Sequence, residues 1–226
     1  MLDYRVLLTA RREEQGRAAA AALAEDGYEV SFQPVDVTDE GALIDLRDRI
    51  KQHFGRLDVL VNTAGIFPDP SPGSPASSIL KAELDVIIRG FETHTLAALR
   101  LCQLMIPLMQ GRGRVVNVSS GMGQLSEMNG CCPAYRLSKT ALNAVTRILA
   151  DELSDTDIKI NSVCPGRVRA DMGGANAPLA VEEGPRASSG PRPCQRTDPA
   201  GASSGRASRF LGEMRASRRA RDDGVD

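Results

Sequence analysis

Hydrophobic and polar positions along the chain follow two different periods. Short runs rich in β-branched residues, which are typical of buried strands, alternate with stretches whose apolar residues recur at helical spacing. The runs cover residues 6–8, 28–37, 57–65, 113–120 and 158–166. The helical stretches cover residues 11–25, 39–54, a long segment that ends near Met109, and 134–153. This alternation predicts an α/β fold with a doubly wound parallel sheet covered by helices on both faces.

Sheets of this kind bind ligands outside the carboxyl ends of their strands. We therefore expect the side chains that contact a ligand to lie where the apolar runs end. The polar or turn residues at these ends are Arg11, Asp36, Asn62, Ser120 and Pro165. An aspartate at such an end could contact a ligand, or it could cap the helix that begins at Thr38 or Asp39. The two roles are compatible for Asp36.

Composition narrows the classes of function. A chain of 226 residues with 42% hydrophobic residues suits one domain with a sizeable core. The formal net charge of -1 argues against nucleic acid and against an anionic membrane surface as partners. The amino terminus lacks the pattern of a secretory signal, and no apolar run approaches the roughly 18 residues of a membrane span. The five cysteines show no CxxC spacing and the two histidines lie far apart, so we expect reduced thiols, no metal site and a cytoplasmic protein.

The character of the chain changes at residue 184. Residues 1–183 carry the patterned segments, whereas residues 184–226 contain few large apolar residues and cannot bury enough surface to fold. Nine arginines outnumber five acidic residues in this second part. We therefore expect a disordered basic tail. A nucleic-acid-binding or partner-binding arm is the alternative, which the lack of lysine and of interleaved aromatic residues disfavours.

The segment PAYRLSKTAL places Tyr135 and Lys139 four positions apart, on one face of a predicted helix. Because a nearby ammonium favours the phenolate, we expect Lys139 to lower the tyrosine pKa from about 10 toward neutrality. The preceding strand ends at Ser119 and Ser120, so a substrate carbonyl could accept hydrogen bonds from both Ser120 and Tyr135. A surface lysine beside a half-buried tyrosine is the alternative interpretation of this spacing.

Four motifs in this order resemble the short-chain dehydrogenase/reductase family. They are Asn62-Thr63-Ala64-Gly65, Ser119-Ser120, the tyrosine–lysine pair, and Cys164-Pro165-Gly166. The resemblance extends from about Val6 to Met172. It implies a Rossmann-like fold and an NAD(P)-dependent oxidoreductase that transfers hydride between NADP(H) and a small-molecule carbonyl or alcohol substrate. NAD is the alternative cofactor.

The resemblance also implies roles for particular residues. Tyr135 would be the general acid/base, Lys139 would hold the nicotinamide ribose, and Ser120 would orient the carbonyl. Ser119 is the fallback, because the interval from Ser120 to Tyr135 is longer than the commonest family pattern. His94 takes the place of an asparagine that helps to maintain a proton-relay water and bends its helix. A histidine would titrate near neutrality there, and a partly exposed helical residue is the alternative.

On the cofactor side, Arg11 stands just after a strand, where the family contacts the adenosine ribose. A guanidinium can form a forked contact with a 2'-phosphate, which favours NADP over NAD. An ordinary charged helix start at Arg11 and Arg12 is the alternative. The resemblance places the other cofactor contacts at Asp36, Val37, Asn62, Ala64, Gly65, Tyr135, Lys139, Pro165, Gly166 and Val168.

Some parts of the family pattern have no match. In the family, the first strand leads into a glycine-rich loop that holds the pyrophosphate at a helix N-terminus, and no segment of this sequence supplies that loop. The interval from Arg11 to Asp36 fits the family's second strand. We therefore expect an incomplete sheet that lacks its first and last strands, with two unpaired edges inside it. Ala170 stands where the family has a threonine that contacts the nicotinamide.

The helices at 91–110 and 134–153 carry apolar residues at helical spacing. The resemblance implies that they build the interface of a homodimer or homotetramer, although core packing explains the same residues. The competing function is a non-catalytic or truncated scaffold or dimerisation protein that does not bind dinucleotide.

Overall fold

The computed structural model describes residues 4–166. Strands and helices alternate along this part of the chain as the hydrophobic pattern predicts. The strands are β1 (Val6–Ala10), β2 (Val30–Pro34), β3 (Val59–Asn62), β4 (Arg112–Val118) and β5 (Asp157–Val163). The α-helices are α1 (Glu13–Glu25), α2 (Glu40–His53), α3 (Leu84–Phe91), α4 (Ala97–Met105) and α5 (Pro133–Glu152). The predicted tail at 184–226, the predicted contact at Val168, and Ala170, which replaces the family's threonine, lie outside the described residues.

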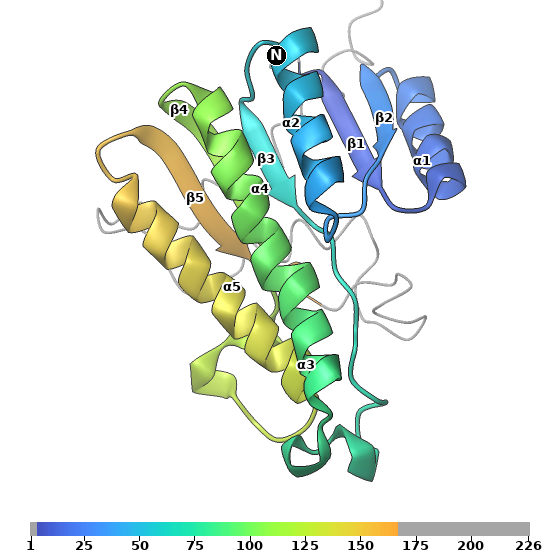
Figure 1. Ribbon diagram of the computed structural model, residues 1–226, viewed down its shortest axis with the longest axis vertical. Helices are drawn as coiled ribbons and strands as arrows, with labels where there is room; N and C mark the ends of the chain where they lie inside the picture. Colours follow the sequence, from blue (N-terminus) through green and yellow to red (C-terminus); the bar gives the residue numbers. More distant parts are fainter. Residues whose placement is uncertain (1–3, 167–226) are drawn as a thin grey trace, which may run out of the picture.

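The strands of residues 4–166 form two parallel sheets rather than one. β1 pairs with β2, and β4 lies between β3 and β5. In Figure 1, β1 and β3 point in the same direction, but no strand in the described part pairs with both of them. This confirms the predicted parallel α/β architecture, in which β1 and β3 each have an edge that no strand of the described part pairs with.

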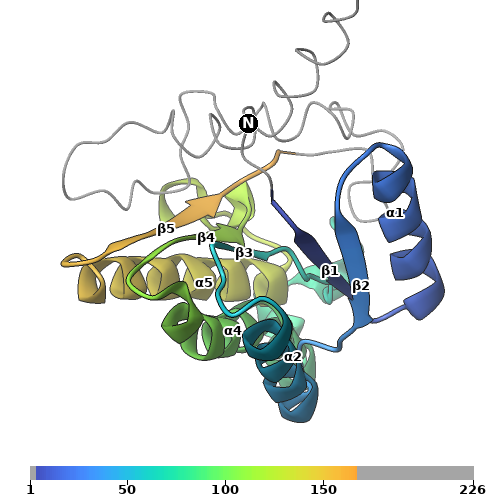
Figure 2. The ribbon, with the colours of Figure 1, turned by 90° about the horizontal axis from the view of Figure 1, so that it is seen from above.

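Helices lie on both faces of these sheets. Figure 2 shows α2, α4 and α5 on one side and α1 on the other. The core between the sheets and the first group of helices has two clusters. They are Val35, Leu43, Leu46, Ile50, Leu101, Leu104 and Met105, and Cys102, Met109, Val115, Ile158 and Ile160. On the opposite face α1 approaches β2 so closely that a Cβ at Gly16 would lie 2.0 Å from the Phe32 ring, so a larger residue at this position would displace that ring.

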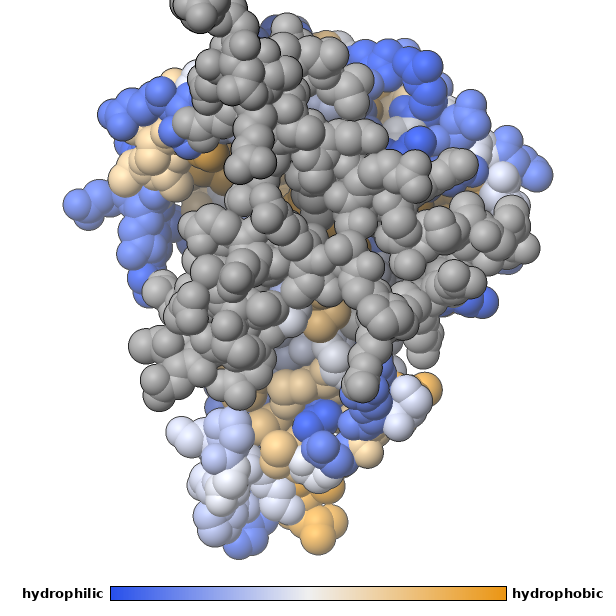
Figure 3. All heavy atoms as spheres, turned by 180° about the vertical axis from the view of Figure 1, so that it is seen from behind, coloured by the Kyte–Doolittle hydropathy of each residue, from blue (hydrophilic) through white to orange (hydrophobic). Residues whose placement is uncertain are grey.

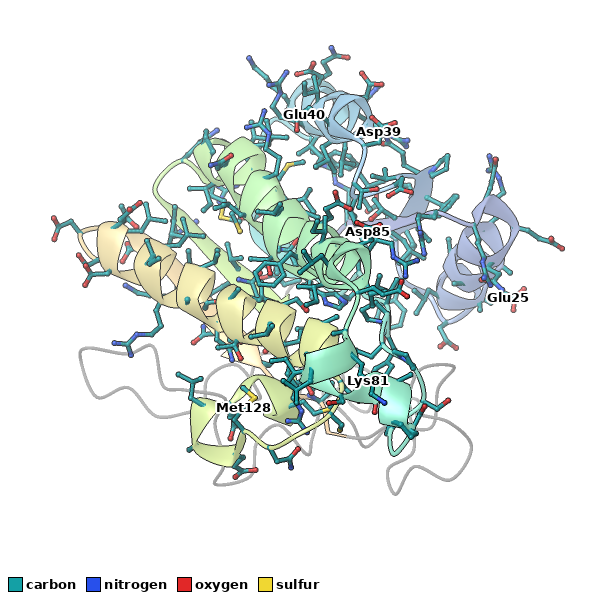
Figure 4. All side chains as sticks on the ribbon, turned by 60° about the horizontal axis from the view of Figure 1, so that its bottom comes forward. Glu25, Asp39, Glu40, Lys81, Asp85 and Met128 are labelled. Carbon is teal, nitrogen blue, oxygen red and sulfur yellow. The ribbon has the colours of Figure 1, made fainter. Side chains whose placement is uncertain are left out.

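The start of α2 is set by a local side-chain cap. The carboxylate of Asp39 accepts from the backbone N–H groups two and three residues further on, at 2.8 and 3.3 Å. Figure 4 shows Asp39 next to Glu40 at this first turn. The alternative in which Asp36 caps the helix is wrong, because its Oδ1 accepts from the backbone N–H and the hydroxyl of Thr38, at 2.9 and 2.7 Å.

The long helix predicted to end near Met109 is a continuous series of turns. α3 passes into a π-helical turn at Glu92–Leu96, then into α4, and ends in a 3₁₀ turn at Ile106–Met109. Pro107 lies in this last turn, as expected for a residue that cannot continue the α-helical hydrogen bonds. Within residues 4–166, none of the helices has the length and apolar character needed to span a membrane.

Two loops frame the N-terminal end of α5. They are the first loop, residues 63–83, and the second loop, residues 119–132. Figure 4 shows Lys81 of the first loop and Met128 of the second at the same end of the molecule. The backbone N–H of Cys132 donates to the carbonyl oxygen of Ser77 at 3.0 Å, which joins the two loops directly.

The end of the molecule formed by these loops carries exposed apolar side chains. Ile79 and Leu80 of the first loop, and Leu84 just after it, are all exposed. Figure 3 shows hydrophobic atoms at the surface of the lower end of the molecule, where the first loop lies. An apolar rim therefore borders the N-terminal end of α5.

Candidate active site

The residues predicted to carry the chemistry meet at the carboxyl end of β4. Tyr135 and Lys139 lie on the first two turns of α5, and the Lys139 Nζ is 5.7 Å from the centre of the Tyr135 ring. A side-chain hydrogen bond links Tyr135 to Ser120, which follows β4. Tyr135 is only 8% exposed and Lys139 only 4%. The alternative of a surface lysine beside the tyrosine is therefore wrong.

The two neighbouring serines have different surroundings. Ser119 is buried, and its Oγ donates to the carbonyl oxygen of Lys139 at 3.5 Å. Ser120 instead accepts from the backbone N–H of Met122 at 3.2 Å and contacts the Tyr135 side chain. The structure therefore brings Ser120, and not the fallback Ser119, together with Tyr135.

The expected electrostatic effect on Tyr135 is not found. Burial raises the pKa of Tyr135; the hydrogen bond with Ser120 lowers it and the nearby Cys164 raises it, so the net direction is upward. The prediction that Lys139 lowers this pKa is therefore wrong. Burial also lowers the pKa of the Lys139 ammonium, to about 8, and its Nζ donates to the carbonyl oxygen of Val118 at 2.8 Å. At neutral pH both side chains therefore keep their protons.

His94 is a buried, neutral residue that connects three segments of the site. Its Nε2 accepts from the backbone N–H of Ile66 at 3.0 Å, so the ring proton lies on Nδ1, 2.8 Å from the Ser138 Oγ. The Ser138 hydroxyl donates to the carbonyl oxygen of Tyr135 at 3.0 Å. The imidazole also meets the Tyr135 ring edge-on, with 5.4 Å between ring centres. His94 therefore helps to fix the position of Tyr135.

Both sequence expectations for His94 need correction. It is 1% exposed, so it is not a partly exposed helical residue. Burial, and to a smaller extent the positive charge of Lys139, lower its pKa to about 4. His94 therefore does not titrate near neutrality. The π-helical turn widens the helix at this point.

The depressed pKa of His94 predicts a loss of stability in acid. In the unfolded chain this histidine takes up a proton near pH 6.5, whereas in the folded chain it does so only near pH 4. The unfolded state therefore binds more protons between these values. Stability is full above pH 6.5 and falls by about 3 kcal/mol as the pH is lowered through 4. Urea denaturation from pH 7.5 to 4 measures this slope, which His94→Asn should reduce; an equal slope in the variant contradicts the assignment.

Asp69 is a site residue that the sequence did not reveal. It is 9% exposed, and its two carboxylate oxygens accept from the backbone N–H groups of Ala134 and Tyr135, at 3.0 and 2.8 Å. The local cap position of α5, Cys132, makes no side-chain cap. A distant carboxylate from the first loop therefore caps the helix that carries Tyr135.

Arg136 is a second site residue that the sequence did not reveal. It holds the second loop against α5. It is 7% exposed, and it donates to the carbonyl oxygens of Cys131 and Met122, at 2.9 and 3.4 Å, and to the Asn129 side chain. The second loop also contains the turn Gly121–Gly123. A Cβ at Gly123 would lie 2.8 Å from the Lys139 backbone, so the turn approaches α5 as closely as glycine permits.

A large cavity is lined by several of the predicted cofactor contacts, but not by Ser120, Tyr135 or Lys139. It measures about 850 Å³ and lies between β1 and β3. The predicted residues that line it are Arg11, Asp36, Val37, Asn62, Ala64, Gly65 and His94. Pro165 and Gly166 follow β5, with Gly166 at a positive φ of 78° that favours glycine.

Two features of this cavity are suited to a polar ligand. Asp36 has a lowered pKa, first because Thr38 donates hydrogen bonds to it and further because the Arg11 guanidinium is nearby. Asn62 donates to the Asn117 Oδ1 at 2.8 Å, while its own Oδ1 is buried and has no hydrogen-bond partner in the described part of the chain. Buried amide oxygens of this kind are rarely left unsatisfied, so a ligand donor could bind there.

Comparison with known proteins agrees with this arrangement. A family model described as short chain dehydrogenase matches residues 2–178. The chain belongs to the short-chain dehydrogenase family, whose members are NAD(P)-dependent oxidoreductases.

Individual relatives give a finer comparison. The chain is 31% identical over 226 aligned positions to carbonyl reductase (NADPH) 3 of Mus musculus, with 79% of this chain and 78% of that protein covered. It is 32% identical over 223 positions to carbonyl reductase (NADPH) 1 of Oryctolagus cuniculus, with the same coverage. Among solved structures, the carbonyl reductase Sniffer of D. melanogaster matches with a TM-score of 0.70 at 28% identity, covering 80% of this chain and 76% of that one.

Proposed function

We infer that this chain is an NADPH-dependent carbonyl reductase in which Tyr135 protonates the substrate oxygen. The observation that carries this proposal is the hydrogen-bonded pair of Ser120 and Tyr135 hydroxyls at the carboxyl end of β4, with Lys139 beside the tyrosine ring. The names of the two mammalian relatives and of Sniffer support a carbonyl substrate, and two of those names support NADPH.

The residues of the site can bind and protonate a carbonyl group. Ser120 and Tyr135 would both donate to the carbonyl oxygen, which orients the group and stabilises the negative charge that develops on it. The raised pKa of Tyr135 keeps its proton available at neutral pH for transfer to that oxygen. Bound NADPH would supply the hydride that the carbonyl carbon accepts. His94 and Asp69 hold the tyrosine backbone and ring in place through the contacts described above.

The residues that line the cavity fit parts of a dinucleotide. The exposed Arg11 guanidinium, with Asp36 and Val37, would contact the adenosine half, and the unpaired Asn62 Oδ1 would accept a hydrogen bond from the ligand. Lys139 has an ammonium that can donate to ribose hydroxyls near Tyr135. Within residues 4–166, only Arg11 and Arg12 connect β1 to α1, and this connection lacks the glycine-rich sequence that usually surrounds a pyrophosphate.

A cofactor titration tests this proposal. NADPH should raise the melting temperature and gain fluorescence on binding, more strongly than NADH does. Arg11→Gln should weaken NADPH binding about 10-fold, through loss of a charge-assisted contact, and leave NADH binding unchanged. Arg12→Gln is the matched control, because Arg12 is exposed but does not line the cavity. No response to millimolar NADPH or NADH would instead support the non-catalytic scaffold.

The surface of the helices fits the self-association that the family resemblance implies. Leu104 and Leu142 are buried core residues, whereas Leu96, Leu137 and Ile148 are exposed on the long helix and on α5. Exposed apolar residues on two neighbouring helices are suited to an interface between subunits. A homodimer or homotetramer is therefore part of the proposed function.

A further inference from the structure

The edge of β1 that faces away from β2 can be assigned residue by residue. The backbone N–H of Val6 donates to the carbonyl oxygen of Glu29 at 2.8 Å, and the carbonyl oxygen of Ala10 accepts from Val35 at 3.1 Å. Alternate residues of a strand direct their backbone groups to the same side, so Val6 and Ala10 face β2. The N–H and C=O groups of Leu7 and Thr9 therefore point away from β2.

The same reasoning applies to β3. The carbonyl oxygen of Asp58 accepts from the backbone N–H of Arg114 at 2.9 Å, so alternate residues from Asp58 onward face β4. The N–H and C=O groups of Val59 and Val61 point away from β4. Each of the two sheets thus has a hydrogen-bonding edge that no strand of residues 4–166 pairs with.

These two edges enclose the cavity of about 850 Å³, which all of β1 and all of β3 line. Its apolar lining includes Leu46 and Ile50 of α2 and Leu101 and Met105 of α4, which belong to the core. β1 and β3 point in the same direction (Figure 1). The cavity therefore has two parallel backbone edges as walls and an apolar floor.

We propose that this cavity is a peptide-binding site, which takes an extended apolar segment as a strand between β1 and β3, parallel to both. Only a strand satisfies both edges, because its alternate residues bond to opposite sides. A strand that is buried on both faces needs apolar side chains at successive positions. The preferred occupant is therefore an uncharged segment rich in valine, isoleucine and alanine.

Binding can be measured with a fluorescein-labelled synthetic peptide of about eight residues, with a valine and alanine centre and a lysine at each end. We expect saturable binding by fluorescence anisotropy. A control peptide with the same side chains and N-methyl groups at alternate central positions lacks the donors for one edge, and it should bind at least about 10-fold more weakly. Equal binding of the two peptides overturns the proposal. The binding assay contains no cofactor and no carbonyl substrate, so its result does not depend on the proposed function.

A variant of the chain gives a second control. Thr9→Pro removes an N–H that points into the cavity while leaving the groups that bond to β2, and it should weaken peptide binding about 10-fold. Thr9→Val keeps that N–H and should bind the peptide as the unsubstituted chain does. Circular dichroism establishes that both variants fold.

Amide hydrogen exchange locates the peptide even if the proline variant fails to fold. The N–H groups of Leu7, Thr9, Val59 and Val61 should exchange rapidly in the free chain and at least about 10-fold more slowly with the peptide bound. Peptide binding without this protection overturns the proposal. Protection of the same four groups in the free chain also overturns it, and sedimentation then distinguishes a second copy in the cavity from a segment of the same chain.

Discussion

Tyr135→Phe is expected to lower kcat for carbonyl reduction by about 10³-fold. The substitution removes the proton donor that shares a hydrogen bond with Ser120, while the ring keeps its contacts with His94 and with Phe67, 5.0 Å away between ring centres. Because the hydroxyl is the only group lost, the free energy of unfolding should change by no more than about 1 kcal/mol. Steady-state oxidation of NADPH with a small aldehyde or ketone, together with urea denaturation, measures both quantities.

Tyr28→Phe provides the matched control for this experiment. Tyr28 precedes β2 and does not line the cavity that holds the predicted cofactor contacts. Its loss of a hydroxyl should leave kcat unchanged. If Tyr135→Phe has the same kcat as the unsubstituted chain, Tyr135 is not the group that transfers the proton. If the variant still binds NADPH, the cofactor site does not depend on the Tyr135 hydroxyl.

The order of the elements was predictable because each strand and helix is encoded locally. The apolar run at 57–65 predicts a buried strand, and β3 occupies its centre. The unpaired edges were also predictable, because the interval from Arg11 to Asp36 matched the family's second strand. The π-helical turn at Glu92–Leu96 could not be predicted from hydrophobic spacing, since a single wider turn leaves the apolar pattern almost unchanged.

The site was predictable only where its residues follow a spacing rule. Tyr135 and Lys139 share a helical face because they are four residues apart. The position of Ser120 was predictable because it comes directly after the end of a strand. The pKa values depend instead on burial by distant segments, because desolvation raises the pKa of Tyr135 and lowers the pKa of Lys139. His94 is likewise buried, and it forms hydrogen bonds with Ile66 and Ser138, neither of which is near it in sequence.

Asp69→Ala is expected to lower the free energy of unfolding by about 3 kcal/mol and kcat by about 10-fold. The carboxylate accepts from the backbone N–H groups of Ala134 and Tyr135, at 3.0 and 2.8 Å, at the positive end of the α5 dipole. Without it, two buried donors lose their partners, and the turn that positions the Tyr135 hydroxyl loosens. Urea denaturation measures the first effect and NADPH oxidation the second.

Asp69→Asn separates the charge of this residue from its shape. The amide keeps one oxygen acceptor but loses the negative charge, so it should recover about half of the lost stability and most of the lost kcat. An effect confined to stability would make Asp69 a helix cap without influence on the tyrosine. A loss of kcat without loss of stability would require a direct contact with substrate, because a buried carboxylate that acts only through the α5 backbone must alter both.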